Sequence, residues 1–474
     1  MNRVLTFAMM LIAIAVATSG CDDEYDFTSD ASCHLSYSGD TLQFEPLLAT
    51  RVTATHTIMV YNHSGEDLKV NEIELHSANG NFQINVDGRT GTRFSDVEIP
   101  DGDSIYIFVR AKVPEQSVDT AVLIQDSITF SYNGNHDRIV LSAYSQNANI
   151  MQGQTIKHDT TWTNAKPFLI LDSLRIAKGA TLTIEQGSIV LLHNGASITV
   201  DGTLDVKGTA SAPVLIGGDR YDNLTSMIPY NRLSKQWGGI NISASSSGNH
   251  IEGTLIRSST YGITIDSAPL PTDGSYRLTI ANSEIRTASE GVLFANHANI
   301  YAYNTVLANG GYRTVYLKGG QYLFNHCTIA CYSSGNRMLG ALTLQGDATN
   351  PLTQADFNNC IVYGSYTNEL NLPTLASATT ANYKFSHCLI RNNKPNDTER
   401  FTDNIWSKDP KFTIDGSYLY YDFHLKDSTS AAYGIGDALL LTQYPECATD
   451  LDANPRTSGN HIQPDAGAYS WVKK

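Results

Sequence analysis

The sequence predicts an all-β protein in which a small β-sandwich precedes a parallel β-helix. Short apolar strands fill residues 167–218, and apolar and polar residues alternate within them, which is the period of a strand. Glycine-containing pairs such as Lys178-Gly179 and Gln186-Gly187 interrupt this stretch at regular intervals. No apolar spacing of the helical kind occurs there, and the strands are too short and too evenly interrupted for a series of hairpins. A chain that winds so that each strand pairs with the strand one coil later satisfies both observations.

The coils also repeat visibly beyond residue 250. An apolar residue lies three positions before each member of a column of mostly small residues, and another lies two positions after it. The members of this column are Thr254, Ser283, Asn304, Cys327, Cys360 and Cys388. These two apolar positions are an odd number of residues apart, so both can face inward only if the chain bends just before the column residue. Asn282, His326 and His387 lie at such bends and suit a left-handed turn conformation. We therefore expect the column to point into the interior of the solenoid.

The segment GATLTIEQGSIVLLHNGASITVDGTLDVKGTASAPV, residues 179–214, resembles the opening of right-handed parallel β-helix domains of bacterial surface proteins. These domains belong to the pectate-lyase-like superfamily, and the resemblance implies a right-handed solenoid over residues 148–474. The segments 407–438 and 450–471 resemble the closing part of such proteins, so we expect residues from about 405 to 474 to cover the last open coil as a C-terminal cap. The resemblance implies little about activity, because function depends on sites added to a fold.

Residues 32–147 carry about seven widely spaced strands, which is typical of an immunoglobulin-like β-sandwich. The words INVDG (84–88), DSIYIFV (103–109) and DSITFSYNG (126–134) resemble the small β-sandwich that follows the lipid anchor in many bacterial surface lipoproteins with a β-helix. This resemblance implies that the sandwich spaces the β-helix from the membrane. The alternative role, as a peptide- or glycan-binding module, has no residue pattern in its favour.

The N-terminus is predicted to be a targeting segment. An apolar run follows Arg3 and ends in Thr18-Ser19-Gly20-Cys21, which resembles a lipobox, so residues 1–20 are a lipoprotein signal peptide and Cys21 is the lipidated residue. An ordinary secretory signal is the alternative. Residues 21–31 form an acidic tether whose start resembles the surface-export signal of some Gram-negative lipoproteins. We expect an outward-facing protein, anchored in the bacterial outer membrane through its N-terminal lipid.

Composition narrows the classes of partner. Aspartate and glutamate number 47 against 32 lysines and arginines, which gives a formal charge of −15. Such an acidic surface argues against nucleic acid as a partner. The cysteines show no Cys-x-x-Cys spacing, and we expect those of the interior column to be buried thiols rather than a disulfide or a metal site.

Enzymatic motifs are missing from the sequence, and no catalytic residue is assigned. Neither the paired aspartates of polygalacturonases nor the Arg-x-Pro-x-x-Arg pattern of pectate lyases occurs, so we predict a non-catalytic protein that binds a glycan or another cell-surface ligand. The alternatives are a carbohydrate-active enzyme, a polysaccharide lyase or glycoside hydrolase acting on an acidic polysaccharide, and an adhesin for a host protein. No cofactor is predicted, although Asp450, Asp452 and Asp465 could bind calcium. Their alternative role is to cap turns and to pair with Arg456.

The predicted ligand site lies on one outer face of the solenoid. Arg257 and Arg286 occupy equivalent positions in successive coils and are expected to face outward, with Glu284 as an internal partner in the structural alternative. The loop at residues 218–236 could form a wall of this site. The aromatic residues expected to stack on sugar rings are Tyr221, Tyr230 and Trp237. Trp237 has the alternative of beginning a coil and packing inside.

Overall fold

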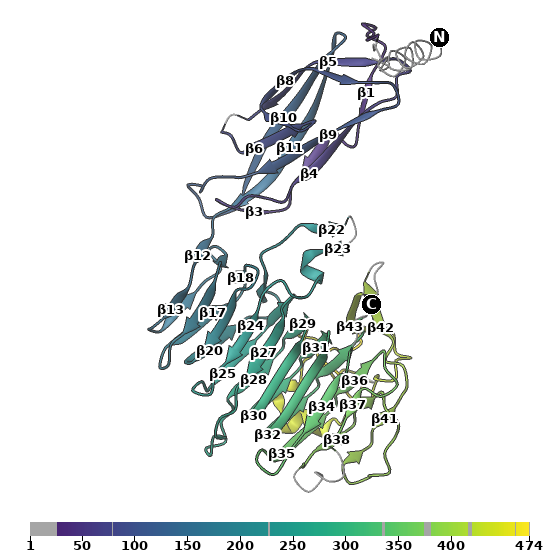
Figure 1. Cartoon of the computed structure of the whole chain (residues 1–474). Coiled ribbons are helices and arrows are strands. Elements are labelled where there is room, and N and C mark those ends of the chain that lie inside the picture. Colours follow the sequence, from purple (N-terminus) through teal and green to yellow (C-terminus); the bar gives the residue numbers. More distant parts are fainter. Residues whose placement is uncertain are drawn as a thin grey trace, which may run out of the picture. The chain divides into compact units, whose positions relative to one another are not determined.

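The computed structural model describes residues 26–77, 79–225, 228–333, 337–373, 381–415, 420–459 and 461–473 (Figure 1). The chain separates into two compact units, residues 1–146 and 147–474, and almost all of its regular structure is β. Among the described residues, no helix is both long and apolar enough to cross a membrane.

The first unit consists of two sheets around one core. The five-stranded antiparallel sheet has the order β1-β4-β9-β6-β7, and its strands are β1 (Leu35–Tyr37), β4 (His56–Asn62), β9 (Ser104–Ala111), β6 (Phe82–Val86) and β7 (Arg89–Gly91). The six-stranded sheet has the order β2-β11-β10-β5-β8, with β3 also paired to β11. Its strands are β2 (Thr41–Gln43), β11 (Asn135–Gln146), β10 (Val122–Tyr132), β5 (Leu68–His76), β8 (Arg93–Ile99) and β3 (Leu47–Leu48). Alternate residues of both sheets, such as Ile107 and Ile128, are buried in a shared hydrophobic cluster.

The second unit is built on two large parallel sheets. In each, a strand pairs with the strand one coil later, which is consistent with a β-solenoid. The eleven-stranded sheet consists of β12 (Asn149–Met151), β15 (Phe168–Ile170), β18 (Ile189–Leu192), β21 (Val214–Gly218), β26 (Thr254–Arg257), β29 (Glu284–Ala288), β31 (Val306–Gly310), β33 (Thr328–Cys331), β36 (Ile361–Gly364), β39 (Leu389–Ile390) and β41 (Ile405–Trp406).

The seventeen-stranded sheet supplies two strands, or one long bent strand, to most coils. It consists of β13 (Gln154–Ile156), β14 (Thr160–Trp162), β16 (Ser173–Ile176), β17 (Thr181–Glu185), β19 (Ser197–Val200), β20 (Thr203–Lys207), β24 (Gly239–Ile242), β25 (Asn249–Glu252), β27 (Tyr261–Ile265), β28 (Leu278–Ala281), β30 (Gly291–Tyr303), β32 (Arg313–Asn325), β34 (Leu342–Gln345), β35 (Leu352–Asn358), β37 (Leu370–Asn371), β38 (Lys384–Ser386) and β40 (Phe401–Thr402). The loop after β21 holds β22 (Asn223–Thr225), β23 (Ile228–Pro229) and the short helix η1 (Tyr230–Arg232).

The interior column is buried as the repeat predicts, with one error of register. Cys327, Cys360 and Cys388 are fully buried free thiols, and the backbone N–H groups of Cys327 and Cys360 donate to the sulfur of the next coil at 3.4 and 3.3 Å. The pairing of β29 with β31 places Thr305, not Asn304, opposite Ser283. The predicted column is displaced by one residue there, because the inward apolar position is occupied by Ala302 and not by Tyr301, which lies three residues before Asn304.

Asn304 instead belongs to the turn column that precedes the interior residues. Every member of this column has a left-handed backbone, with φ between 47° and 53°, as the turn hypothesis requires. The members are Asn282, Asn304, His326, Asn359, His387 and Asp403. Their side chains bond from coil to coil: Asn304 Nδ2 donates to Asn282 Oδ1 at 3.0 Å, and Asn359 Nδ2 lies 3.0 Å from His326 Nε2.

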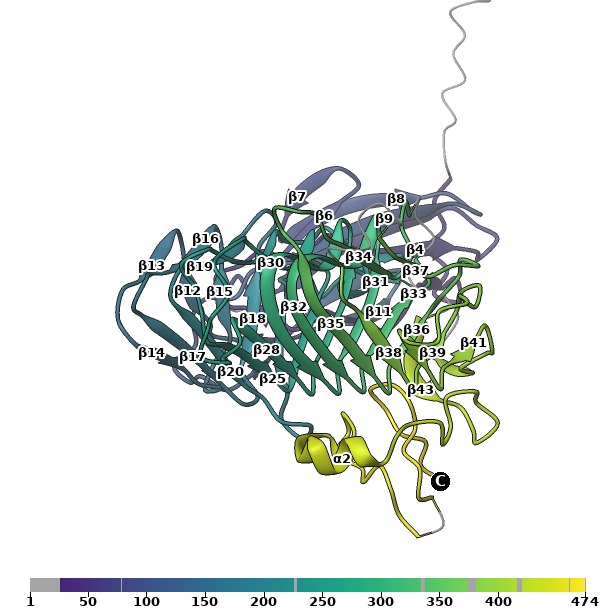
Figure 2. The same ribbon diagram turned by 90° about the horizontal axis from the view of Figure 1, so that it is seen from below.

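The closing segment lies along the flank of the solenoid. It contains β42 (Phe412–Asp415), β43 (Tyr420–Leu425), α2 (Leu439–Gln443) and η3 (Pro445–Cys447), and Figure 2 shows it in yellow-green and yellow beside the parallel strands. We expected it to cover the open end of the last coil, but its buried side chains pack on the outer face of the eleven-stranded sheet. From that sheet the cluster takes Val306, Ala308, Ala330, Ile361, Tyr363 and Leu389, and from the segment Phe412, Phe423, Leu425, Ala432, Ala466, Ala468 and Tyr469.

Candidate functional site

The predicted arginine pair is equivalent in the structure but does not form an open face. Arg257 of β26 stands directly opposite Arg286 of β29, as the repeat predicts. Arg286 is only 3% exposed, so its expected outward exposure was wrong. The closing segment covers it: Arg286 Nη2 donates to the Tyr421 carbonyl at 2.6 Å, and Nη1 lies 3.1 Å from Glu284. Glu284 is therefore the internal partner that the structural alternative predicted.

The aromatic residues of the 218–236 loop are also occupied. Trp237 is buried, and its Nε1 donates to the Arg257 carbonyl at 2.8 Å, so it packs inside the coil and is not available to stack on a ligand. Arg220 lies over the ring of Tyr230, with its Cζ 3.4 Å from the ring centroid. Burial raises the pKa of Tyr221, and the nearby Arg257 opposes that shift. The structure thus brings Tyr221 near Arg257 but offers no open row of aromatic rings here.

The three aspartates of the closing segment have different hydrogen-bond partners, and that of Asp452 is His424, whose Nε2 lies 2.8 Å from Oδ2. Asp450 accepts hydrogen bonds from the backbone N–H groups of Asp452 and Asn454 at 3.0 and 2.8 Å, which is turn capping. Asp465 accepts from the backbone of Gly434 and Trp471, both at 2.7 Å.

Arg456 lies near these aspartates in sequence. Arg456 donates to Asn304 and to Ala468 rather than to these carboxylates. Within the described part of the chain no group of three or more potential metal ligands occurs. Cys21 lies outside the described residues.

A different cluster lies on the outer side of the seventeen-stranded sheet. Because side chains alternate along a strand, Phe294 of β30 and Tyr316 of β32 point away from the core while Leu293 and Leu317 point into it. The two aromatic residues are directly paired, and their rings stack with centroids 5.2 Å apart and planes 15° apart. This pair forms a flat, half-buried aromatic surface that bridges two coils.

Arg313 completes this surface. It stands opposite Gly291, and a Cβ at that glycine would lie 3.2 Å from Arg313 Cγ, so the glycine leaves room for the arginine stem. The Arg313 guanidinium lies 5.0 Å from the ring centroids of both Phe294 and Tyr316. Its Nε is buried and has no hydrogen-bond partner among the described residues. Because that nitrogen is buried, a carboxylate or sulfate from outside would bond the terminal amino groups of this half-buried side chain.

A groove of about 330 Å³ begins one coil further along, beside Tyr316, whose partner Thr343 on the next strand lines it, whereas Phe294 and Arg313 do not. Lys318, two residues after Tyr316 on the same face, contributes to its wall, and Tyr316 Oη donates to Gln345 Oε1 at 2.5 Å. Lys318 lies 3.5 Å from Asp347, an exposed pair that solvent screens. The lining residues are Lys318, Leu339, Thr343, Leu344, Gln345, Gly346, Asp347, Asn371, Leu372 and Pro373. The groove therefore offers amide, hydroxyl and ammonium groups beside an aromatic surface.

Carboxylates and tyrosines gather at another place on the same sheet. Tyr301 Oη donates to Glu446 Oε1 at 2.5 Å, and Asn282 donates to Glu252 at 3.3 Å. Burial, reinforced by the charges of Glu252 and Glu446, raises the pKa of Tyr303 to about 12. A tyrosine that abstracts a proton needs a lowered pKa, so this environment works against Tyr303 as a base.

Sequence reasoning missed Phe294, Arg313 and Tyr316. The signal was present, because the words GVLFA and TVYLK place Phe294 and Tyr316 at equivalent outward-facing positions of neighbouring coils. It was overlooked because the repeat was followed only along the column that contains the cysteines.

No family model and no curated protein matches this sequence. Among solved structures, a protein of unknown function from Porphyromonas gingivalis W83 is 16% identical, with 24% of this chain and 46% of that chain covered and a TM-score of 0.18. A family 123 glycoside hydrolase from Clostridium perfringens is 10% identical, with 25% and 30% covered and a TM-score of 0.17. The match thus covers less than half the length of either protein.

The catalytic unit of a thermostable GH87 alpha-1,3-glucanase from Streptomyces thermodiastaticus strain HF3-3 is 9% identical. Here 79% of this chain and 91% of that chain are covered, with a TM-score of 0.22. At these TM-scores the likenesses carry no argument about function.

Proposed function

We propose that the protein binds an acidic polysaccharide, without catalysis, on the outer side of its seventeen-stranded sheet. The observation that carries this proposal is Arg313, a half-buried arginine whose guanidinium lies beside the stacked rings of Phe294 and Tyr316. A sugar ring presents apolar C–H faces that pack on aromatic surfaces, while a uronate or sulfate group accepts two hydrogen bonds from a guanidinium. The groove lined by Lys318 and Gln345 would receive the next units of the chain.

We further propose that the solenoid is right-handed, that the first unit is an immunoglobulin-like spacer, and that lipidated Cys21 anchors the chain in a Gram-negative outer membrane. The two-sheet arrangement of the first unit and the acidic residues after Cys21 support this view. Protease treatment of intact cells tests the outward orientation, with cleavage of the wild type expected. Full protection of the wild type in cells with an intact outer membrane would contradict it, and a Cys21→Ser variant should leave the membrane fraction.

The binding site is tested by affinity electrophoresis in gels that contain polygalacturonate, alginate or chondroitin sulfate. We expect the wild type to be retarded by at least one of these polymers, and Arg313→Ala and Tyr316→Ala to lose the retardation. Arg175→Ala is the matched control, because Arg175 lies on β16 of the same sheet with its side chain 58% exposed. Retardation that is equal in all four proteins would place the site elsewhere, and no retardation by any polymer would contradict the proposal.

The alternative is a polysaccharide lyase or glycoside hydrolase that acts on the same class of polymer. The nearby carboxylate of Glu446, to which Tyr301 donates, is the observation in its favour, whereas the raised pKa of Tyr303 works against it. A lyase would release unsaturated uronate products that absorb ultraviolet light, and a hydrolase would release reducing ends. We expect neither signal from the purified wild type incubated with the three polymers.

A further inference from the structure

The first unit carries an exposed aromatic surface that its role as a spacer does not explain. Along β9 the inward residues Ile107 and Val109 are fully buried, whereas Tyr106 and Phe108 point outward and are 51% and 42% exposed. The two outward rings lie nearly parallel, with centroids 6.1 Å apart and planes 11° apart. Exposed aromatic rings carry a cost in water, because burial of a large apolar side chain is worth roughly 1.5–3 kcal/mol. A pair of them in the middle of a sheet therefore points to a ligand.

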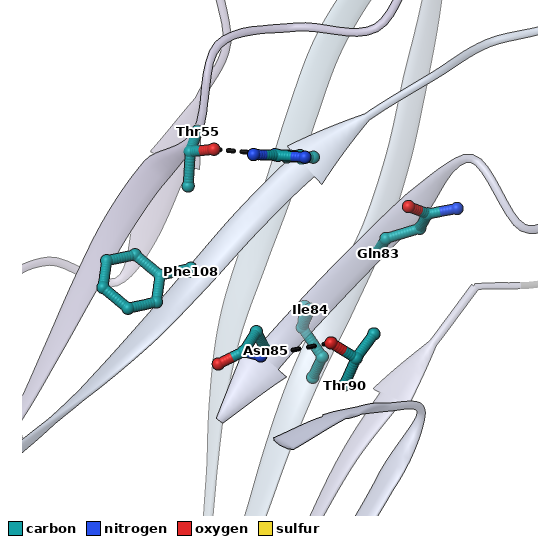
Figure 3. Close-up of a pocket in the computed structure, with 7 residues that line it drawn as sticks. Thr55, Gln83, Ile84, Asn85, Thr90 and Phe108 are labelled. Atoms are coloured by element: carbon teal, nitrogen blue, oxygen red, sulfur yellow. Dashed lines mark hydrogen bonds between the residues drawn. The ribbon is translucent and has the colours of Figure 1, made fainter. Parts of the chain in front are cut away.

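A pocket of about 420 Å³ adjoins Phe108 on the same face (Figure 3). Its floor is formed by β6 and β9, whose register places Asn85 opposite Phe108 and Gln83 opposite Arg110. Figure 3 shows Asn85 joined to Thr90, with Nδ2 donating to Oγ1 at 3.1 Å, and Phe108 at the side of the pocket. The lining residues are Thr55, Gln83, Ile84, Asn85, Thr90, Phe108 and Arg110.

These groups retain most of their capacity to bind a ligand. Arg110 donates through Nε to Thr55 Oγ1 at 2.7 Å, a bond that orients the guanidinium and leaves its two terminal amino groups as donors. Asn85 keeps its side-chain oxygen as an acceptor, since its Nδ2 makes the bond to Thr90. Gln83 adds a second amide. The pocket thus presents both hydrogen-bond donors and hydrogen-bond acceptors beside an aromatic surface.

We propose that this face, defined by Gln83, Asn85, Tyr106, Phe108 and Arg110, is a second carbohydrate-binding site that takes an oligosaccharide. Sugar hydroxyls both donate and accept hydrogen bonds, which matches the mixture of amide, hydroxyl and guanidinium groups. The C–H face of a pyranose ring packs on Phe108 and Tyr106, which removes their apolar surface from water.

The backbone of this face argues against a peptide as the occupant. A peptide that adds to a sheet needs free main-chain donors and acceptors at an edge strand. Here β9 is paired on one side with β4 and on the other with β6 along most of its length, so its main-chain groups are already used. Recognition at this face must therefore be made by side chains.

The second site is independent of the groove on the solenoid, and the test must separate the two. The full-length protein carrying Arg313→Ala and Tyr316→Ala is the starting variant, so that the solenoid groove no longer contributes. It is applied to an array of neutral and uronate-containing oligosaccharides of glucose, mannose, galactose, N-acetylglucosamine and galacturonate, and the strongest binder is then measured by calorimetry.

We expect the starting variant to bind at least one oligosaccharide, and a further Phe108→Ala or Asn85→Ala change to weaken that binding by about tenfold or more. Tyr144→Ala is the matched control and should change the affinity less than about twofold, because Tyr144 is 48% exposed but lies on β11 in the other sheet. Retained circular dichroism spectra and melting temperatures show that each variant is folded. If the starting variant binds no oligosaccharide, or if Phe108→Ala behaves like Tyr144→Ala, the proposal is overturned.

Discussion

Arg456 donates a hydrogen bond from Nη2 to Oδ1 of Asn304 at 2.7 Å, across 152 residues of sequence. The guanidinium is fully buried, and burial lowers its pKa to about 10. The same nitrogen also donates to the Ala468 carbonyl at 3.1 Å, so one cation connects the turn column of the solenoid with the closing segment.

The first prediction concerns this cation. Arg456→Met should lower the free energy of unfolding by about 1–3 kcal/mol, because it leaves Oδ1 of Asn304 buried without a donor, whereas the Ala468 carbonyl keeps the backbone N–H of Leu451. Urea unfolding followed by circular dichroism measures the change. Arg175→Met is the control and should have an effect within about 0.5 kcal/mol, since that side chain is exposed. An equal effect of the two substitutions would show that the Arg456 bond contributes nothing.

The second prediction concerns a fully buried ion pair. Arg337 and Glu369 are joined by two hydrogen bonds of 2.7 and 2.9 Å, and the ring of Tyr366 lies 3.8 Å from the guanidinium. Glu369→Ala should cost about 3–5 kcal/mol, because it leaves a buried cation without its partner. The double variant Arg337→Met/Glu369→Leu should be markedly more stable than the single one, as measured by thermal unfolding. A double variant that is no better than Glu369→Ala would indicate that packing, not charge, dominates this site.

The third prediction concerns the thiols of the interior column. Burial raises the pKa of Cys360 and Cys388 well above the usual range, so little reactive thiolate forms at neutral pH. We expect Cys327, Cys360 and Cys388 to resist a maleimide reagent at pH 8 in the folded protein and to react once urea unfolds it. Mass spectrometry of tryptic peptides identifies the modified residues. Rapid labelling of the folded protein, or a disulfide between these peptides, would contradict the structure.

The fourth prediction is a pH dependence at His424. Burial opposes its protonation, but the carboxylates of Asp452, 2.8 Å from Nε2, and Asp422, 3.5 Å from Nδ1, outweigh that effect and raise its pKa to about 10. Because an unfolded histidine has a pKa of about 6.5, this group stabilises the fold fully below about pH 6.5 and loses that contribution as the pH rises towards 10. The stability difference between wild type and His424→Gln should therefore shrink from pH 6 to pH 10. A difference that stays constant over this range would contradict the raised pKa.

Much of the fold could be predicted because strand periodicity is a local signal. Strands such as β4, β9 and β10 lie where alternating residues predict them, and the buried cysteines lie in the expected column. β8, with its sequence RFSDVEI, escapes the alternation signal because its buried Phe94 and Val97 are three residues apart, with Asp96 between them in a left-handed conformation (φ 52°). The register error at Asn304 arose for a similar reason: a tyrosine on the outer face resembles an inward apolar residue in sequence.

The site was harder to predict, because exposure depends on contacts between distant segments. Arg286 has the alternation of an outward residue, and only the fold reveals that Phe423 and Tyr421 cover it. Nor does alternation distinguish the outward Phe294 and Tyr316 from other surface aromatics. The pocket beside Phe108 needs Gln83 and Arg110 to be neighbours, which follows from strand pairing and not from their separation in the chain.

The position of the closing segment has a consequence for biosynthesis. Coils of a simple solenoid contact only their neighbours and can fold in the order in which they are made. Here the apolar strip of Val306, Ala308 and Ala330 is exposed to solvent until the closing segment has been synthesised and packs on it. A nascent chain that stops near residue 408 would therefore be an intermediate with this apolar strip exposed to solvent, and such intermediates are prone to aggregate.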